Sequence, residues 1–296
     1  MTWKPRAAPK YRKRSTSSGE EHTDMNNSST ITRDRLLLVA AAAFVSTLVF
    51  YLVIYYIYQP LATGAAIAWA LVVLIVLFYV DRKRTGMLGL ENENRELRAF
   101  INLQPLFGKT FVPYGFWAME ANNLQSLLST IQYNGYRTVV ECGAGVSTLL
   151  IGNLLRQLGQ GHIFSLEEDE KWHAVMTSAI VHEGLADYVT VLHAPLEANA
   201  DSGAAWYSLV VARQILEQAE QIDLLLVDGP KSIATLSRYP ALPFFAPALH
   251  QHSLIVLDDS KRTNELAVIK KWGEVLKIDV QQVNQSLRGQ AHIRLG

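Results

Sequence analysis

The sequence predicts an α/β fold, with a doubly wound, mostly parallel seven-stranded sheet preceded by two transmembrane helices. From residue 136 onward, short apolar runs typical of buried strands alternate with segments of helical periodicity. Two uncharged apolar runs of membrane-spanning length precede this pattern. Residues 138–148 read as a strand, a glycine turn and a helix N-terminus, a junction at which the backbone can approach a ligand closely.

The predicted strands and helices follow one another in a regular order. Helices are predicted over 117–132, 148–158, 170–183, 205–220, 236–246 and 264–276. Strands are predicted over 138–142, 162–166, 189–192, 222–227 and 253–257, and then over 278–283 and 290–294 as a terminal hairpin. Strands that alternate with helices imply a parallel sheet that is covered on both faces.

The two apolar runs cover residues 36–58 and 61–80. Each is long enough to cross a hydrocarbon core of about 30 Å. Buried core helices of a soluble protein are the alternative, but neither run has a polar face. Only Gln59 and Pro60 separate the runs, so a tight transmembrane hairpin is predicted.

Basic residues flank both outer ends of this hairpin, Arg33 and Arg35 before it and residues 82–84 after it. By the positive-inside rule, both termini and the α/β domain are predicted to face the cytoplasm. The chain is therefore predicted to be a multi-pass protein of the cell (inner) membrane. The predicted organisation is a disordered basic tail (1–35), the hairpin (36–80), a juxtamembrane helical linker (81–104) and the α/β domain (105–296).

Charge and cysteine content exclude some classes of site. Residues 85–296 hold sixteen basic against twenty-two acidic side chains, which argues against a nucleic-acid partner. The single cysteine, Cys142, excludes an intrachain disulfide and a multi-cysteine metal site. We expect it to pack beneath the glycine turn.

Acidic side chains end four of the five predicted parallel strands, at the edge where open α/β sheets bind ligands. A packed core gives no reason for this pattern. In chain order, the strand ends carry Glu141 with Gly143 and Gly145; Glu167, Glu168 and Asp169; His193 and Ala194; Asp228 and Lys231; and Asp258 and Asp259.

The glycine turn distinguishes between two kinds of ligand. Glu167 lies near the spacing at which an acid accepts hydrogen bonds from a ribose. However, the third glycine of a dinucleotide-binding turn is missing, and Glu141 would be unfavourable beside a pyrophosphate. It would be a good partner for an ammonium group. A nicotinamide-dependent oxidoreductase is therefore disfavoured.

Several motifs together resemble a bacterial branch of the class I S-adenosylmethionine-dependent methyltransferases, which have a Rossmann-like fold. The similarity covers about residues 100–296. The motifs are Val-Glu-Cys-Gly-Ala-Gly-Val-Ser-Thr at 140–148, Ser-Leu-Glu-Glu-Asp at 165–169 with Trp172, Val-Asp-Gly-Pro at 227–230, Arg-Tyr-Pro-Ala-Leu at 238–242, and Leu-Asp-Asp at 257–259 with Arg262 and Glu265.

The resemblance implies a role for each matching residue in binding S-adenosyl-L-methionine. Glu167 would bind the ribose hydroxyls, and His193 and Ala194 would contact the adenine. Other expected cofactor contacts are Glu168 and Asp228. The amino-acid end of the cofactor would be held by Glu141, Gly143, Ala144, Gly145 and Ser147.

This part of the chain is also similar to the catechol-type O-methyltransferases. That similarity implies that Asp228, Asp258 and Asp259 hold Mg²⁺ and that Lys231 is a base. Asp259 departs from the family pattern, in which the third ligand is an amide. The alternative is that the aspartates anchor substrate or loops without a metal.

The resulting hypothesis is a membrane-anchored methyltransferase that methylates an oxygen of a small-molecule, lipid-linked or envelope-glycan acceptor. Asp228 or Lys231 would remove the proton. The segment with Tyr114 and Trp117 precedes the fold where it could cover the cleft. A catalytically inactive membrane-tethered scaffold is the alternative from another class.

Overall fold

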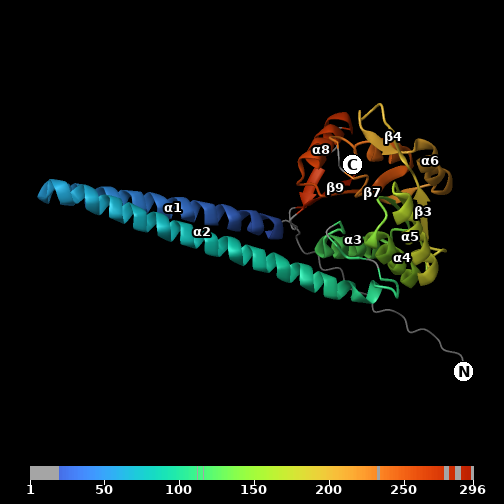
Figure 1. The fold of residues 1–296 in the computed structure, drawn as a ribbon, viewed down its shortest axis with the longest axis horizontal. Coiled ribbons are helices and arrows are strands. Elements are labelled where there is room, and N and C mark those ends of the chain that lie inside the picture. The colour runs from blue at the N-terminus through green and yellow to red at the C-terminus, as the bar shows by residue number, and fades with distance from the viewer. Residues whose placement is uncertain are drawn as a thin grey trace, which may run out of the picture. The chain divides into compact units, whose positions relative to one another are not determined.

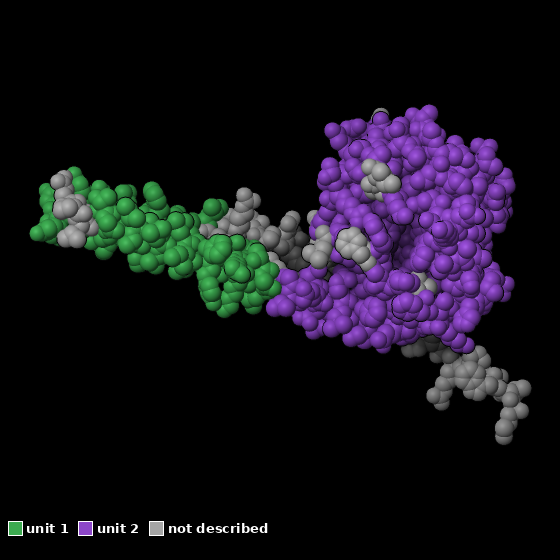
Figure 2. Space-filling model, viewed as in Figure 1, with its two compact units in different colours: residues 1–87 green, residues 88–296 purple. Residues whose placement is uncertain are grey.

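A computed structural model describes residues 20–111, 113–115, 117–231, 234–276, 280–283 and 288–294. The chain divides into two compact units, Met1–Met87 and Leu88–Gly296 (Figure 2). The division falls inside the predicted linker, seventeen residues before its expected end at 104. The last turns of this helical segment belong to the second unit, because Ala99 and Leu103 are buried in its core.

Two long helices account for the described part of the first unit. Helix α1 covers Glu20–Ile57, and α2 covers Gln59–Leu103 and continues into the second unit. Pro60 stands in the first turn of α2, where its missing N–H is not needed. Leu37–Ile57 and Thr63–Leu106 are long and apolar enough to cross a membrane, by length and composition. They are weak support for membrane association.

The predicted disordered tail is wrong for residues 20–35, which form the beginning of α1. No proline or glycine lies between Gly19 and Pro60, so nothing in the sequence interrupts a helix that continues outward from the apolar run. The remainder of the predicted tail, residues 1–19, lies outside the described residues.

The second unit contains the predicted seven-stranded sheet, in the order β3-β2-β1-β6-β7-β9-β8 (Figure 1). Neighbours from β3 to β7 are parallel, whereas β9 is antiparallel to both β7 and β8. The sheet is made of β1 (Thr138–Cys142), β2 (His162–Glu167), β3 (Val189–His193), β6 (Ile222–Val227), β7 (Leu249–Asp258), β8 (Val280–Val283) and β9 (Gln290–Arg294).

Helices cover both faces of this sheet. The α-helices are α3 (Ala121–Asn134), α4 (Val146–Leu158), α5 (Glu170–Glu183), α6 (Leu209–Gln218), α7 (Ala241–Phe245) and α8 (Thr263–Leu276). Two 3₁₀ turns, η1 (Gln104–Leu106) and η2 (Ala246–Ala248), accompany them.

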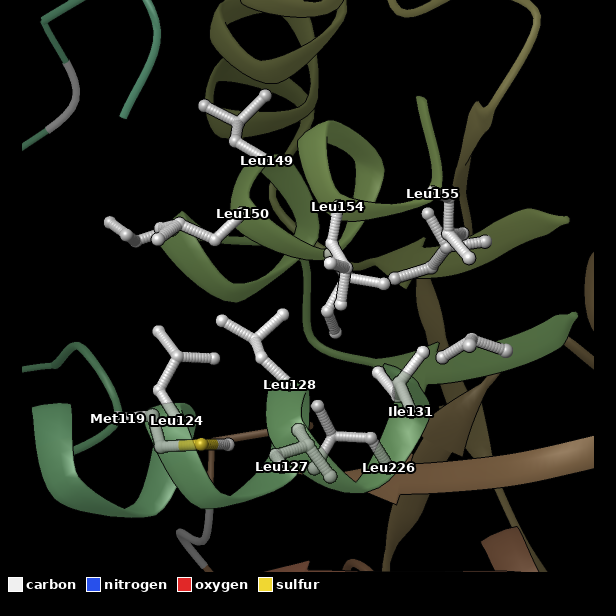
Figure 3. Close-up of a cluster of buried hydrophobic side chains, with 14 of the residues drawn as sticks. Met119, Leu124, Leu127, Leu128, Ile131, Leu149, Leu150, Leu154, Leu155 and Leu226 are labelled. Carbon is white, nitrogen blue, oxygen red and sulfur yellow. The ribbon is translucent and has the colours of Figure 1, made fainter. Parts of the chain in front are cut away.

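Alternate side chains of the central strands enter two different hydrophobic cores. Leu224 and Leu226 of β6 belong to one core, and Leu225 and Val227 to the other. This is the two-residue period of a strand that is buried on both faces. Figure 3 shows the first core, in which leucines of α3 and α4 face one another beside Leu226.

Three predicted helices differ from the structure. The helix predicted over 117–132 begins only at Ala121, as α3. The helix predicted over 205–220 begins instead with β5 (Ala205–Tyr207), which pairs with β4 (Leu196–Ala198) in a hairpin, and α6 follows it. Asn199 Oδ1 accepts two backbone N–H bonds across the hairpin turn, at 3.1 Å each, and Gly203 has a φ of 67°.

The predicted helix 236–246 is reduced to the five residues of α7. Pro240, Pro243 and Pro247 lack the N–H groups that a longer helix requires. Residues 234–240, which precede α7, form a bend and turns rather than a helix.

Candidate functional site

A cavity of about 730 Å³ lies at the carboxyl ends of the parallel strands. Loops after β1, β2, β6 and β7 contribute to it, together with the segment that precedes α3. Its lining residues are Pro113, Gly115, Trp117, Ala118, Met119, Gly143, Ala144, Gly145, Val146, Ser147, Glu167, Glu168, Asp169, Lys171, Trp172, Val175, Asp228, Gly229, Lys231, Arg238, Asp259 and Arg262. Most of the predicted site residues are thus brought together.

The glycine turn after β1 approaches the loop after β6 very closely. Gly143 has a φ of 100°, and a Cβ at this position would lie 3.0 Å from the backbone nitrogen of Gly229. At the other end of the turn, Gly145 is the N-cap of α4, and its N–H donates to Thr148 Oγ1 at 2.8 Å. The backbone therefore requires glycine at 143, whereas Gly145 has an extended φ of −168° and a Cβ there would meet only Ser147 Oγ, 4.0 Å away.

Glu141 lies beneath the turn rather than in the cavity. The residue is fully buried. Its Oε1 accepts from Ser147 Oγ at 2.5 Å, and its Oε2 accepts from Thr148 Oγ1 at 2.5 Å and Ser165 Oγ at 2.6 Å. The arrangement differs from the expected contact with an ammonium group, because hydroxyls surround the carboxylate. Ser147, Thr148 and Ser165 are the sequence signal for this arrangement.

Burial raises the pKa of Glu141 to about 7, although the three hydroxyl donors oppose the shift. The folded state thus prefers the protonated form, so this group favours folding most at low pH. Its contribution declines as pH rises from the ordinary value of 4.5 through the folded value.

As pH rises from 4.5 to 7, we therefore expect the free energy of unfolding of Glu141→Gln to increase by about 3 kcal/mol relative to that of the wild type. The amide is isosteric and does not titrate, so other ionisable groups cancel in the comparison. Urea unfolding of the two proteins at several pH values measures the difference. A stability difference that is independent of pH would contradict the buried-carboxyl assignment.

The end of β2 is connected to the glycine turn. Asp169 Oδ1 caps α5 by accepting from the N–H of Trp172 at 2.8 Å. The indole Nε1 of Trp172 in turn donates to the carbonyl oxygen of Ala144 at 2.8 Å. Trp172 thereby fixes one wall of the cavity next to the turn.

Glu167 and Glu168 line the same wall. Glu167 Oε1 accepts from the N–H of Asp169 at 2.8 Å, and burial raises the pKa of Glu167 to about 7. Glu168 Oε2 accepts from the hydroxyl of Tyr207 at 3.4 Å. Both carboxyl groups are therefore held in place at the cavity edge.

His193 and Ala194 are not among the residues that line the cavity. Ala194 is buried, and its N–H donates to the carbonyl oxygen of Glu167 at 2.8 Å. The ring of His193 lies 5.6 Å from that of His173, measured between centroids. The expected adenine contacts are therefore not brought to the cavity in this arrangement.

Three predicted aspartates do converge, after β6 and β7. One carboxylate oxygen of each of Asp228, Asp258 and Asp259 lies within 4.8 Å of the others. Asp228 and Asp259 line the cavity, whereas Asp258 lies behind them and is buried. Burial raises the pKa of Asp228 to about 6, and burial and the two neighbouring aspartates raise that of Asp258 well above its ordinary value.

Arg238, the first residue of the Arg-Tyr-Pro-Ala-Leu motif, connects several acids around the cavity. Its Nη2 lies 3.6 Å from Asp228 Oδ1 and 3.7 Å from Asp259 Oδ2. Its Nη1 lies 3.6 Å from Glu265 Oε1, which is fully buried. Arg262 forms a second ion pair with Asp259, at 2.8 Å. Nothing in the sequence spacing indicates that these groups meet.

The expected Mg²⁺ can be tested against these contacts. Hard carboxylate oxygens suit the ion. However, Asp228 and Asp259 are already paired with guanidinium groups, and Asp258 Oδ1 accepts from Asn123 Nδ2 and Gln290 Nε2 at 3.4 Å each. A divalent ion would face a buried guanidinium at close range. The residues present therefore do not fit Mg²⁺.

The segment before α3 closes the cavity from a further side. Trp117 lines the cavity, as expected of a covering segment, whereas Tyr114 does not. The hydroxyl of Tyr114 donates instead to the carbonyl oxygen of Met119 at 2.8 Å, and Arg288 Nη1 donates to that of Ala118 at 3.2 Å.

Buried Cys142 packs in the core beneath the turn.

Comparison with known proteins gives one family match. Residues 140–260 match the model of a methyltransferase domain. This range contains the glycine turn, the acidic end of β2 and the aspartate cluster. A search of curated proteins finds no match.

Solved structures that are similar to this chain include three methyltransferases. The SAH-bound methyltransferase PaMTH1 of Podospora anserina is 16% identical, with a TM-score of 0.49, and the match covers 72% of this chain and 96% of that chain. A putative caffeoyl-CoA O-methyltransferase of Staphylococcus aureus is 13% identical (TM-score 0.45; 73% and 98% covered). A putative O-methyltransferase of Klebsiella pneumoniae is 17% identical (TM-score 0.46; 68% and 90% covered).

The matched methyltransferase domain contains the turn and the acidic strand ends that surround the cavity. Residues 140–260 of this chain are thus similar to a methyltransferase domain.

Proposed function

We propose that the chain is a membrane-anchored O-methyltransferase whose acceptor is a small molecule or a lipid-linked or glycan-type compound of the cell envelope. The observation that carries the proposal is a single cavity that holds both the glycine turn and Asp228. A methyl donor at the turn and an acceptor hydroxyl at Asp228 would share that cavity.

The donor half of the cavity would hold S-adenosylmethionine. Gly143, Ala144 and Gly145 leave room for its amino-acid end beside the N-terminus of α4, where the cofactor's carboxylate is favoured. Glu167, on the neighbouring wall, is placed to accept hydrogen bonds from ribose hydroxyls. Glu141 contributes indirectly, since it fixes the turn from below.

The acceptor half would consist of Asp228, Lys231 and the covering segment with Trp117. When bound, the cofactor supplies a methyl group on a positively charged sulfur. The residues of the chain hold the acceptor oxygen in line with that methyl carbon and exclude water. A C–O bond forms as the C–S bond breaks, and the acceptor proton passes to a base.

Asp228 suits the role of base better than Lys231. It lines the cavity, and its pKa of about 6 keeps most of the group ionised at neutral pH. Lys231 also lines the cavity, and its backbone N–H donates to Glu168 Oε1 at 3.5 Å, which ties this loop to the end of β2. We assign to Lys231 the orientation of the acceptor rather than removal of the proton.

The membrane part of the proposal depends on the two apolar helices. Their side chains are exposed within the structure, with Leu38, Phe44 and Phe78 each at least two-thirds accessible. A bilayer would cover this surface. The basic residues outside both apolar runs favour cytoplasmic termini and a cytoplasmic cavity.

Above pH 7, where most of Glu167 is ionised, Glu167→Gln is expected to weaken the binding of S-adenosylhomocysteine by roughly tenfold to a hundredfold, because a charged acceptor of ribose hydrogen bonds is lost. Isothermal titration of the purified full chain in detergent measures the affinity. Glu183→Gln, on the far end of α5, is the matched control. Equal affinities of the two variants would remove Glu167 from the cofactor site.

Two further assays distinguish the other functions. Binding of S-adenosylhomocysteine without transfer of a labelled methyl group to any compound of a cell extract would favour an inactive scaffold. Thermal stabilisation by NADH instead of S-adenosylhomocysteine would favour an oxidoreductase. Neither result is expected, because the cavity contains both the donor turn and a base.

A further inference from the structure

We infer that Arg238 supplies the positive charge of the aspartate cluster in place of a divalent cation, and that methyl transfer by this chain is metal-independent. Arg238 is a positioning residue in this proposal. It holds Asp228 toward the acceptor, and its positive charge makes the binding of Mg²⁺ or Mn²⁺ to the cluster unfavourable.

The guanidinium connects every element that carries an acid of the cluster. Its Nη2 faces Asp228 after β6 and Asp259 after β7, and its Nη1 faces Glu265 on α8. Two backbone carbonyls fix the group further: Nε donates to Pro230 at 3.2 Å, and Nη1 to Asp258 at 3.3 Å. A planar group with five N–H donors can make these contacts together, whereas a lysine cannot.

The burial of Arg238 shows that its charge has no solvent partner. Only 3% of the residue is exposed. A buried cation must be compensated by nearby anions, and the three acids within 4 Å provide that compensation. The negative charge of these acids is therefore already balanced by a cation of the protein.

The remaining aspartate of the cluster is held in a different way. Asp258 forms no ion pair with Arg238 among the described residues, and its Oδ1 accepts from two side-chain amides, those of Asn123 and Gln290. Arg262 adds a second cation at Asp259. A metal ion bound to all three aspartates would have to displace these partners and lie beside two guanidinium groups.

The backbone at Asp259 is consistent with a site shaped by these contacts. Its φ of 58° lies in the left-handed region, which non-glycine residues adopt at a cost and aspartate tolerates better than most. The conformation aims Oδ2 at both arginines, at 3.7 Å and 2.8 Å. Strain of this kind persists where surrounding contacts determine it.

Removal of the charge tests the idea directly. Arg238→Met keeps an unbranched side chain but removes the cation paired with Asp228 and Glu265 and leaves Asp259 with Arg262 alone, so the variant should acquire the divalent site that the wild type lacks. Arg213→Met, on the exposed face of α6, is the matched control. Arg238→Lys, which keeps a charge, should resemble the wild type in Mn²⁺ binding.

Mn²⁺ binding is measured on the full chain in detergent by electron paramagnetic resonance, with S-adenosylhomocysteine titrated into the same samples. We expect no stoichiometric Mn²⁺ site in the wild type and in Arg213→Met at about 1 mM ion. Arg238→Met should bind one Mn²⁺ with a dissociation constant at least roughly tenfold below that concentration. Its melting temperature should rise when the ion is added and fall again with EDTA.

A stoichiometric Mn²⁺ site in the wild type, or turnover that EDTA abolishes and Mg²⁺ restores, would overturn the inference. So would an Arg238→Met variant that folds and gains no site. If that variant does not fold, the wild type decides, since absence of an Mn²⁺ site together with EDTA-insensitive turnover supports the inference. The inference rests on the proposed function only where turnover is measured. Failure of S-adenosylhomocysteine to bind would count against that function and leave the Mn²⁺ result to be judged separately.

Discussion

Gly143→Ala should remove most of the affinity for S-adenosylhomocysteine and lower the free energy of unfolding by about 3 kcal/mol. A side chain at a φ of 100° is strained, and its Cβ would lie 3.0 Å from the nitrogen of Gly229 and 3.2 Å from its Cα. Backbone cannot move aside as a flexible side chain can. The turn or the loop after β6 must shift, and both line the cavity.

The control for this prediction is Gly184→Ala, at the C-cap of α5. Gly184 also has a positive φ, 65°, but a Cβ there meets nothing within 4 Å. This variant carries the conformational cost alone, about 1 kcal/mol, and should bind S-adenosylhomocysteine like wild type. Chemical unfolding and isothermal titration measure both quantities. Similar losses in the two variants would show that close packing of the turn is unimportant.

Asp228→Asn should lower turnover by about 10²–10⁴-fold, because an amide cannot accept the proton of the acceptor. Affinity for S-adenosylhomocysteine should change little. In the wild type, turnover should fall as pH drops below about 6, since the base is then protonated, and it should level off above that value. Transfer of a labelled methyl group, followed against pH, measures both effects.

Asp258→Asn is the matched control for the base. The same substitution is made in the same cluster, but Asp258 does not line the cavity, and its raised pKa favours the neutral form that asparagine resembles. Turnover should stay within a few-fold of wild type. If Asp258→Asn were as damaging as Asp228→Asn, the cluster would act as a unit and Asp228 would lose its special role.

Much of the fold follows from local patterns in the sequence. The bounds of β1 and β6 agree with prediction to the residue, because buried strands of a parallel sheet are continuous apolar runs between turn residues. The bounds of β9, which is antiparallel to its neighbours, also agree. The β4–β5 hairpin could not be predicted from the sequence. Ala205–Tyr207 is too short for an alternating pattern to distinguish it from the helix that follows.

The candidate site could be predicted in part. Strand ends are local features, so the sequence places Gly143, Glu167 and Asp228 at one edge of the sheet. Side-chain partners depend on how loops fold back, and a motif does not report this. The contact of Glu141 with the amino-acid end of the cofactor therefore stays a prediction. The meeting of Arg238 with Glu265, a contact between a loop and α8, has no local signature.

The contact between the two strand-end loops has a consequence for how acceptors can vary. The N–H groups of Asp228 and Gly229 both donate to the carbonyl oxygen of Cys142, at 3.0 Å and 2.5 Å, directly before the glycine turn. Main-chain hydrogen bonds thus hold the loop that carries Asp228 against the glycine turn. The covering segment around Trp117 belongs to neither loop, so its sequence can change, and the acceptor with it, without altering the geometry of methyl transfer.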